Sequence, residues 1–388
     1  MRILHTSDWH LGRSFHREGL LDAQAVFVDH LLDTIKTELV DLVVVSGDIY
    51  DRALPPVDAV KLADETFARL AASRAQVVVT SGNHDSARRL GFNSRLIDAS
   101  GVYFRTDASG CGVPVLLEDQ HGPVAVYGLP YLEPDLLREP WQLDSRSHTA
   151  VIGEAMRRVA ADLAGRTRGT RSVAMAHAFV AGGDTSDSER DISVGGVSMV
   201  PTSLFDGVDY AALGHLHGRQ VLTEAVRYSG SPLAYSFSET SHVKGSWLVD
   251  LGADGLEQAE FVEAPVPRRL AKLRGDLETL LEDPSIAAKE DCWVQAVVTD
   301  PVRPAQAMER LRTRFPHTLV LSFEPSGRDQ ASSPARRAVG GRSDHDIALD
   351  FVAEVRGTPA TDAESALLLD ACDCCRQSGE ADQVLGTA

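Results

Sequence analysis

Apolar and polar residues alternate in blocks along about the first 260 residues of the chain. Short runs rich in valine, isoleucine and leucine predict buried strands, and the longer stretches between them have the apolar spacing of helices. This alternation indicates an α/β domain built of layered β-sheet with flanking helices. The predicted strands span residues 2–6, 41–46, 76–80, 172–176 and 210–213.

Three helices are predicted between these strands. The first joins the first two strands, the second follows Pro55 and Pro56, and the third covers about residues 147–163 and ends at Gly165. The apolar face of the first helix is predicted to contain Val28, Leu31, Leu32, Ile35 and Leu39. The same face of the second is predicted to contain Val60, Ala63, Phe67 and Leu70.

The proline pair Pro265 and Pro267 marks the end of this first domain, which we place at residues 1–264. Residues 268–325 hold two strand-like and two helix-like segments, enough for a small α+β module. Its clearest strand lies in the sequence WVQAVVTD.

A change of composition follows the module. Residues 326–344 are rich in serine, glycine, arginine and alanine, which is typical of a flexible linker. Residues 345–377 then form a predicted helical tail, whose second helix opens with a possible capping box at Thr361 and Glu364. The first tail helix places Ile347, Phe351 and Val355 at four-residue spacing.

Composition and charge narrow the class of protein. Hydrophobic residues make up 43% and charged residues 24% of the 388, and no apolar stretch reaches the roughly 18–20 residues that span a membrane. Five cysteines without disulfide-type spacing, and no signal-peptide pattern, predict a cytoplasmic protein. The net charge of −18 argues against a nucleic-acid partner, although a locally basic surface or bound cations can offset it.

Side chains that bind metals follow all five predicted strands. Each short motif alone is a common turn, cap or surface feature, but chance poorly explains five of them at strand ends in one domain. Because ligands bind beyond the carboxyl ends of strands in open α/β sheets, we expect these residues to meet at one edge. The predicted metal ligands are Asp8, His10, Asp48, Asn83, His177, His215 and His217.

Seven oxygen and imidazole donors exceed what one ion with an open coordination position needs. Two ions that share a carboxylate would use them, and Asp48 is the natural bridge because an anionic ligand can serve both cations. The absence of thiolates from the set favours Mn²⁺, Fe or Zn²⁺. Gly47, Gly82 and Gly214 would let the backbone approach the site closely.

His84 directly follows the predicted ligand Asn83, so the two residues would not comfortably bind one ion. We expect His84 instead to donate a hydrogen bond to a phosphoryl oxygen or a proton to the leaving oxygen. Asp85 either orients His84 or caps the next turn.

The order DxH, GDxxD, GNHD, H and GHxH resembles the calcineurin-like metallophosphoesterases. The nuclease branch that includes bacterial SbcD is the closer likeness, through the stretches ILHTSDWHLGR, GDIYDRALPP, SERDISVGG, GHLHGRQ and YSGSPLAYSFSE. The resemblance is strong over about residues 1–260 and mainly one of layout beyond them.

This resemblance implies a nuclease with two Mn²⁺ ions that cuts DNA ends, hairpins and blocked ends. It implies a homodimer within a heterotetramer, whose other subunit is an SbcC-type, SMC-like ATPase. The module would cap the DNA and the tail would bind the ATPase. By position, Asp8, His10, Asp48 and His217 would hold one ion, and Asp48, Asn83, His177 and His215 the other. Archaeal relatives carry a histidine where this chain has Asp51, so the resemblance assigns Asp51 no role.

Two other functions are compatible with the same residues. A phosphomonoesterase or cyclic-nucleotide phosphodiesterase would need the same metal site, and a non-catalytic scaffold could hold DNA ends and the ATPase together. Arginines near the strand-end motifs could form a basic rim for DNA. They are Arg13, Arg52, Arg88, Arg89, Arg95 and Arg219.

Overall fold

The computed structural model describes residues 1–190, 199–326 and 343–385. The chain divides into two compact units, Met1–Pro325 and Ser326–Ala388. Most of the predicted linker, and the last six residues of the SERDISVGG stretch, lie outside the described residues.

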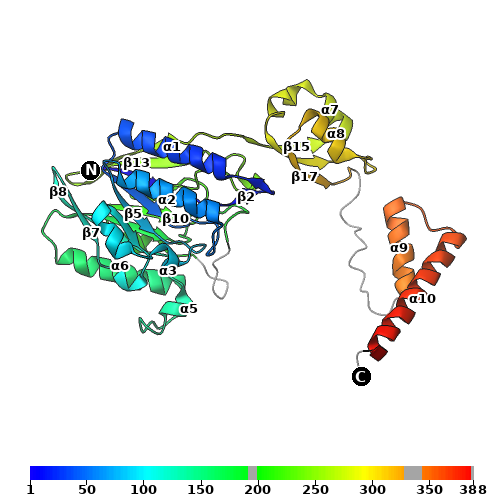
Figure 1. Cartoon of the computed structure of the whole chain (residues 1–388), viewed down its shortest axis with the longest axis horizontal. Coiled ribbons are helices and arrows are strands. Elements are labelled where there is room, and N and C mark those ends of the chain that lie inside the picture. Colours follow the sequence, from blue (N-terminus) through cyan, green and yellow to red (C-terminus); the bar gives the residue numbers. More distant parts are fainter. Residues whose placement is uncertain (191–198, 327–342, 386–388) are drawn as a thin grey trace. The chain divides into compact units, whose positions relative to one another are not determined.

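The first unit is built on two six-stranded sheets (Figure 1). The first sheet has the order β14 (Gly255–Glu263), β13 (Gly245–Gly252), β1 (Arg2–Thr6), β4 (Leu42–Ser46), β5 (Gln76–Thr80) and β6 (Val102–Arg105). The second has the order β11 (Gln220–Val221), β12 (Val226–Tyr228), β10 (Tyr210–Gly214), β9 (Arg171–His177), β8 (Gly122–Gly128) and β7 (Val115–Asp119).

Helices cover the outer faces of both sheets. The helices α1 (Leu21–Thr37) and α2 (Val57–Ala71) pack on the first sheet, and α6 (His148–Ala164) packs on the second (Figure 1). Valine-rich strands form the layer between the sheets, where residues such as Val44 and Val78 meet Val173. Because both faces of each sheet are covered, the sequences of these strands are nearly continuous apolar runs.

The predicted fold class is confirmed, with one difference in how its strands are arranged. Each of the five predicted strands agrees with an observed strand to within a residue at either end. They do not share a sheet, however: β1, β4 and β5 are parallel neighbours in the first sheet, and β9 and β10 are parallel neighbours in the second. The polar strand ends therefore converge across two facing sheets.

Two residues of the predicted helix faces are exposed. Leu39 is 63% exposed and has a φ of 53°, because α1 ends before it and the chain turns so that Val40 enters the core. Val60 is 43% exposed, because the buried side of α2 is formed by smaller residues such as Ala59 and Ala63.

The small module contains three parallel strands where the sequence pattern predicted two. They are β15 (Leu270–Gly275), β16 (Trp293–Val298) and β17 (Thr318–Phe323), with α7 (Leu277–Glu282) and α8 (Ala307–Arg314) between them. Trp293 of this module stacks on Phe15 of the first domain, with ring centroids 5.2 Å apart.

The second unit is a pair of helices, α9 (Asp344–Arg356) and α10 (Asp362–Leu385). The predicted capping box is present, since the backbone nitrogen of Thr361 donates to Glu364 over 2.8 Å and the backbone nitrogen of Glu364 donates back to the threonine hydroxyl over 3.4 Å. Among the helices that the structure describes, none is long and apolar enough to cross a membrane.

Candidate metal centre

The loops after β1, β4, β5, β9 and β10 bring all seven predicted ligands into one neighbourhood. Three overlapping groups of carboxylate and imidazole ligand atoms lie there within 4.8 Å of one another: Asp8 with His10 and His217, His10 with Asp48 and His84, and Asp8 with Asp48 and His177. Six predicted ligands are at most 4% exposed, namely Asp8, His10, Asp48, His177, His215 and His217. Asn83 and His84 are half-buried at the edge of the cluster.

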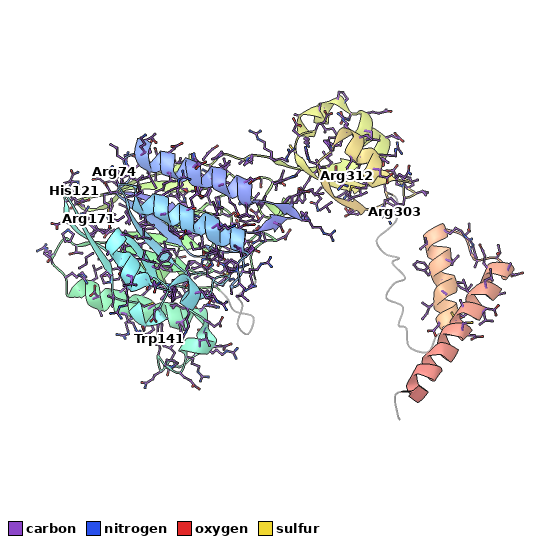
Figure 2. All side chains as sticks on the ribbon, in the orientation of Figure 1. Arg74, His121, Trp141, Arg171, Arg303 and Arg312 are labelled. Atoms are coloured by element: carbon purple, nitrogen blue, oxygen red, sulfur yellow. The ribbon has the colours of Figure 1, made fainter. Side chains whose placement is uncertain are left out.

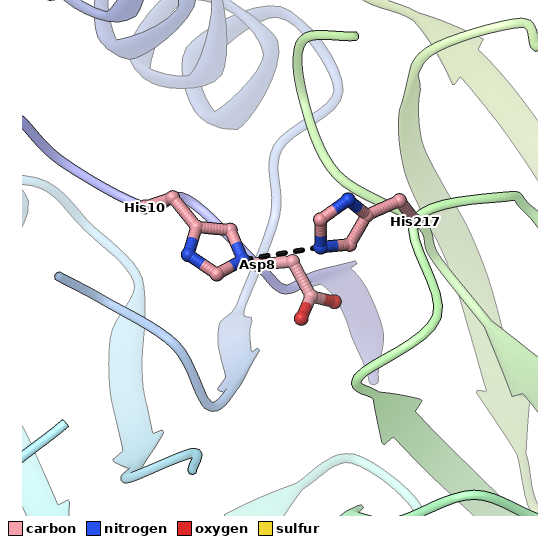
Figure 3. A group of neighbouring side chains, drawn as sticks. All are labelled: Asp8, His10 and His217. Carbon is pink, nitrogen blue, oxygen red and sulfur yellow. Dashed lines mark hydrogen bonds between the residues drawn. The ribbon is translucent and has the colours of Figure 1, made fainter. Parts of the chain in front are cut away.

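On one side of the cluster, the DxH motif after β1 meets the GHxH motif after β10. The Nε2 atoms of His10 and His217 lie 3.1 Å apart, and the Asp8 carboxylate lies beside them (Figure 3). The backbone nitrogen of His215 donates to both oxygens of Asp8 over 3.1 Å. This carboxylate is thereby held at the junction of β1 and β10.

The other side is organised around Asn83 and Asp48. The Asn83 Oδ1 atom lies 2.8 Å from His177 Nε2 and 3.2 Å from His215 Nδ1. Asp48 Oδ2 lies 3.4 Å from His177 Nε2 and 3.6 Å from His10 Nε2, so Asp48 stands between the two sides. This is the place that a bridging carboxylate requires.

The backbone around these side chains adopts conformations that are uncommon for residues other than glycine. Asp8, His10 and Asp48 have φ values of 53°, 46° and 50°. Gly82 permits the close approach of Asp48, because a Cβ atom on Gly82 would lie 2.1 Å from Asp48 Oδ1. Strained backbone that tightly packed surroundings maintain is frequent at functional sites.

Burial and mutual contacts change the pKa values of the cluster. Burial raises the pKa of Asp8 to about 6. Burial also acts to raise the pKa of Asp48, but its contacts with His177 outweigh burial and hold this pKa well below its ordinary value. In turn, burial lowers the pKa of His177, yet Asp48 raises it further, to about 9. Without a cation, Asp48 and His177 therefore form an ion pair.

His10 and His215 behave in the opposite way, since burial lowers the pKa of both well below the ordinary value. Neutral imidazoles keep the lone pair that a metal ligand needs. Two buried polar atoms in the cluster, His10 Nδ1 and Asn83 Nδ2, have no hydrogen-bond partner among the described residues. Carboxylate, amide and imidazole donors in this arrangement fit divalent cations.

His84 and Asp85 have separate roles in the loop after β5. The backbone nitrogen of His84 donates to Asp48 Oδ1 over 2.8 Å, and its ring Nδ1 lies 2.7 Å from the Asp51 carbonyl. The Asp85 carboxylate accepts hydrogen bonds from the backbone nitrogens of Ile49, Tyr50 and Gly82. Asp85 thus caps backbone groups of the loop after β4 and of its own loop, and among the described contacts it neither orients the His84 ring nor caps the turn that follows it.

Two protein families match successive parts of the chain. Residues 1–219, more than half of the chain, match the family described as calcineurin-like phosphoesterase. The chain belongs to the calcineurin-like phosphoesterases. Residues 266–356 match a second family, SbcD_C, described as the type 5 capsule protein repressor C-terminal domain. This calcineurin-like phosphoesterase therefore has the domain composition of an SbcD-like protein.

A solved structure is also similar to this calcineurin-like phosphoesterase. The crystal structure of TT1561 of Thermus thermophilus has 12% sequence identity and a TM-score of 0.40. The match covers 68% of this chain and 98% of that one.

The residues behind His217 were not assigned a role from the sequence. Ser188 Oγ lies 2.6 Å from His217 Nδ1 and 2.5 Å from a carboxylate oxygen of Glu239, and Lys244 pairs with the other oxygen of Glu239 over 2.5 Å. The signal was present, because Ser188 lies in SERDISVGG and Glu239 in YSGSPLAYSFSE. Neither Ser188 nor Glu239 directly follows one of the predicted strands, so the search for polar residues at strand ends did not identify them.

Only part of the arginine group lies at the site. Arg13 and Arg52 approach the Asp51 carboxylate to 3.6 and 3.7 Å. Arg89 donates to the Ala53 carbonyl over 2.9 Å. The guanidinium of Arg219 instead lies 4.4 Å over the ring of Phe261.

Proposed function

We propose that this protein is a two-metal-dependent DNA nuclease, a 3′–5′ exonuclease on double-stranded ends and an endonuclease on hairpins or blocked ends. It would act with an SbcC-type, SMC-like ATPase in double-strand break processing, repair and recombination. One observation carries the proposal: a single chain combines the buried Asp and His cluster, with His84 at its edge, and a C-terminal region that matches SbcD_C.

The seven clustered donors would hold two divalent cations, which we propose to be Mn²⁺. When bound, such a pair supplies positive charge to a phosphodiester and lowers the pKa of water. Asp48 would serve both cations, because it stands between the two sides of the cluster. We assign Asp8, His10 and His217 to one ion and Asn83, His177 and His215 to the other.

His84 would act on the phosphodiester itself. Its Nδ1 atom faces the Asp51 carbonyl, so Nε2 is the atom through which it would reach a substrate. As water attacks phosphorus and the bond to the leaving oxygen breaks, a proton from His84 Nε2 would pass to that oxygen. Burial lowers the pKa of His84, which makes its imidazolium a stronger acid but a smaller fraction of the population at neutral pH.

The remaining parts of the chain would serve partners. On the tail helices, the described side chains of Phe351, Val355 and Leu367 are 64–70% exposed, which supports a docking surface for the ATPase. We assign the module at residues 268–325 to positioning DNA, and we propose that the protein acts as a homodimer within a heterotetramer.

The test is cleavage of a labelled hairpin duplex by the purified protein with Mn²⁺, alone and with a coexpressed SMC-like ATPase. The matched variants are His84→Ala and His121→Ala. Figure 2 labels His121, an exposed residue next to the β7–β8 turn and away from the strand ends that carry the ligands. We expect His84→Ala to cut at least about 100-fold more slowly with its metal content unchanged, and His121→Ala to cut like the wild type.

The other candidate functions predict different results. Rapid turnover of p-nitrophenyl phosphate, with no DNA cleavage under any condition, would assign the same metal site to a phosphomonoesterase. A protein that binds both metal ions but cleaves neither substrate would support a scaffold.

A further inference from the structure

The second ring nitrogen of His217 is held by a buried network that no metal motif includes. Its Nε2 atom faces His10 and Asp8, whereas the other ring nitrogen points away from them (Figure 3). That second nitrogen, Nδ1, lies 2.6 Å from the hydroxyl oxygen of Ser188. The hydroxyl lies in turn 2.5 Å from Glu239 Oε1.

A count of hydrogens fixes the direction of these bonds. Serine has one hydroxyl hydrogen, and Glu239 is ionised because Lys244 Nζ lies 2.5 Å from its other oxygen. The hydroxyl hydrogen therefore goes to Glu239, and the hydroxyl oxygen accepts from His217 Nδ1. His217 is thereby held as the tautomer with its proton on Nδ1, and the lone pair of Nε2 is directed into the cluster.

The Glu239–Lys244 pair is also held in place by burial and hydrogen bonds. The two residues are 1% and 3% exposed, and Lys244 Nζ uses its three hydrogens on Glu239, the His217 carbonyl and Ser231 Oγ. Glu239 Oε1 also accepts from the backbone nitrogen of Tyr235 over 3.2 Å. A buried pair that is fully hydrogen-bonded specifies one arrangement of its neighbours.

Ser188 is held in place from a third segment. The Arg13 guanidinium donates to the Ser188 carbonyl over 2.9 Å, and the adjacent Glu189 accepts from the backbone nitrogen of His217 over 2.8 Å. The loop after β1, the loop after β9 and the segment before β13 thus all meet behind His217.

The other imidazoles of the cluster lack such support. His177 Nδ1 lies 3.0 Å from the Ser46 carbonyl, and His215 Nδ1 faces Asn83. His10 Nδ1 has no hydrogen-bond partner in the part of the chain that the structure describes. The Asp51 carboxylate lies 3.8 Å from His10 Nδ1, beyond hydrogen-bond distance. Among these four histidines, only His217 has its Nδ1 atom hydrogen-bonded to a charged side-chain network of described residues.

We propose that Ser188, Glu239 and Lys244 are positioning residues that set the tautomer and orientation of His217 as a metal ligand. This inference rests on the proposed metal centre. Carboxylates that orient metal-binding histidines usually contact the ring directly, and their loss costs about 10- to 100-fold in metal affinity. Here the serine hydroxyl carries the contact between carboxylate and ring.

The test measures binding of Mn²⁺ alone to the full chain after treatment with EDTA, by titration calorimetry. Its variants are Ser188→Ala, Ser188→Thr and Glu239→Gln. The control is Ser172→Ala, because Ser172 is also a buried serine whose hydroxyl donates to a carboxylate, that of Asp209 over 2.9 Å, at the far end of β9. Thermal unfolding of each metal-free variant reports any loss of stability separately.

We expect Ser188→Ala to weaken one of two Mn²⁺ sites by about 10- to 100-fold. Ser188→Thr, which keeps the hydroxyl, should restore affinity to within a few-fold, and Glu239→Gln should weaken the same site. Ser172→Ala should bind both ions like the wild type, even if its metal-free form unfolds at a lower temperature.

Three results would overturn the inference. If Ser188→Ala bound two Mn²⁺ ions with wild-type affinity, the positioning role would be rejected and the proposed function would remain. Equal weakening by alanine and threonine at position 188 would show that packing, and not the hydroxyl, matters. Failure of the wild-type chain to bind Mn²⁺ would reject the metal centre and the positioning role together.

Discussion

The two ends of strand β9 neutralise buried charged side chains in different ways. At its beginning, Arg171 is 2% exposed and contacts Asp119 over 2.5 Å, and its guanidinium also donates to the Gly122 and Gly252 carbonyls. Figure 2 labels Arg171 at this end of the sheets. At the end of the same strand, His177 lies among the buried carboxylates of Asp8 and Asp48.

The difference lies in where the positive charge comes from. At the amino end the chain supplies an arginine, so the carboxylate is neutralised within the fold. At the carboxyl end, no lysine or arginine of the described residues forms a hydrogen bond or salt bridge with the carboxylates of Asp8 and Asp48, whose partners are hydroxyl, backbone and histidine groups. There the metal-free protein relies on protons, with the pKa of His177 raised to about 9 by Asp48 against burial, and that of Asp8 raised to about 6 by burial. Bound cations would replace those protons.

The largest effect should come from changing the central carboxylate at the metal end. Asp48→Asn removes the charge that stands between the two sides of the cluster, so we expect nuclease activity to fall more than about 10³-fold and both metal sites to weaken. The matched change at the other end, Asp119→Asn, should leave the metal content and rate per folded molecule as in the wild type. Metal analysis and cleavage of the hairpin duplex measure both.

An Asp48→Asn protein that kept two metal ions and most of its activity would contradict the assignment of the bridge. A loss of metal in Asp119→Asn would contradict the independence of the two ends.

Arg171→Met should lower the stability of the protein and leave its metal binding unchanged. Asp119 would keep its contact with the N-terminal ammonium, 2.6 Å away, but it would lose its arginine, and the Gly122 and Gly252 carbonyls would lose a donor. We therefore expect the free energy of unfolding to fall by about 3 kcal/mol. Chemical unfolding of the EDTA-treated protein measures this loss. The variant should still bind Mn²⁺, and unchanged stability would show that the backbone carbonyls and water compensate for the arginine.

Adding Mn²⁺ to the EDTA-treated proteins should change their stability by a slightly smaller amount. A ligand that binds only the folded state at 100 times its Kd adds about 2.7 kcal/mol per site. We therefore expect Mn²⁺ to raise the Tm of the EDTA-treated wild type and of Arg171→Met by similar amounts. Asp48→Asn should show little rise, and an equal rise in all three proteins would place the metal elsewhere.

The sequence predicted which polar side chains cluster better than it predicted the surrounding architecture, for a physical reason. Predicted ligands such as Asp8, Asp48 and His177 follow apolar runs directly, so a local pattern identifies them. The division of the strands between two sheets depends on pairing between residues far apart in sequence, which local periodicity does not encode. For the same reason, the contact between Ser188 and Glu239, 51 residues apart, is visible only in the fold.

The smallest expected effect is the loss of the stability that Asp119 contributes when the pH is lowered. Burial acts to raise the pKa of Asp119, but the hydrogen bonds from Arg171, the N-terminal ammonium and the backbone nitrogen of His121 outweigh burial and hold this pKa well below its ordinary value of 3.8. A depressed folded-state pKa gives stability that is present above the unfolded value and is lost as the pH falls below it. The stability difference between wild type and Asp119→Asn should thus be constant from about pH 6 to 5 and shrink by about 1 kcal/mol toward about pH 3. Urea unfolding of both EDTA-treated proteins measures this difference, in which the titration of the groups at the carboxyl end of β9 cancels. A difference independent of pH would show that Arg171 and the N-terminal ammonium do not hold Asp119 ionised.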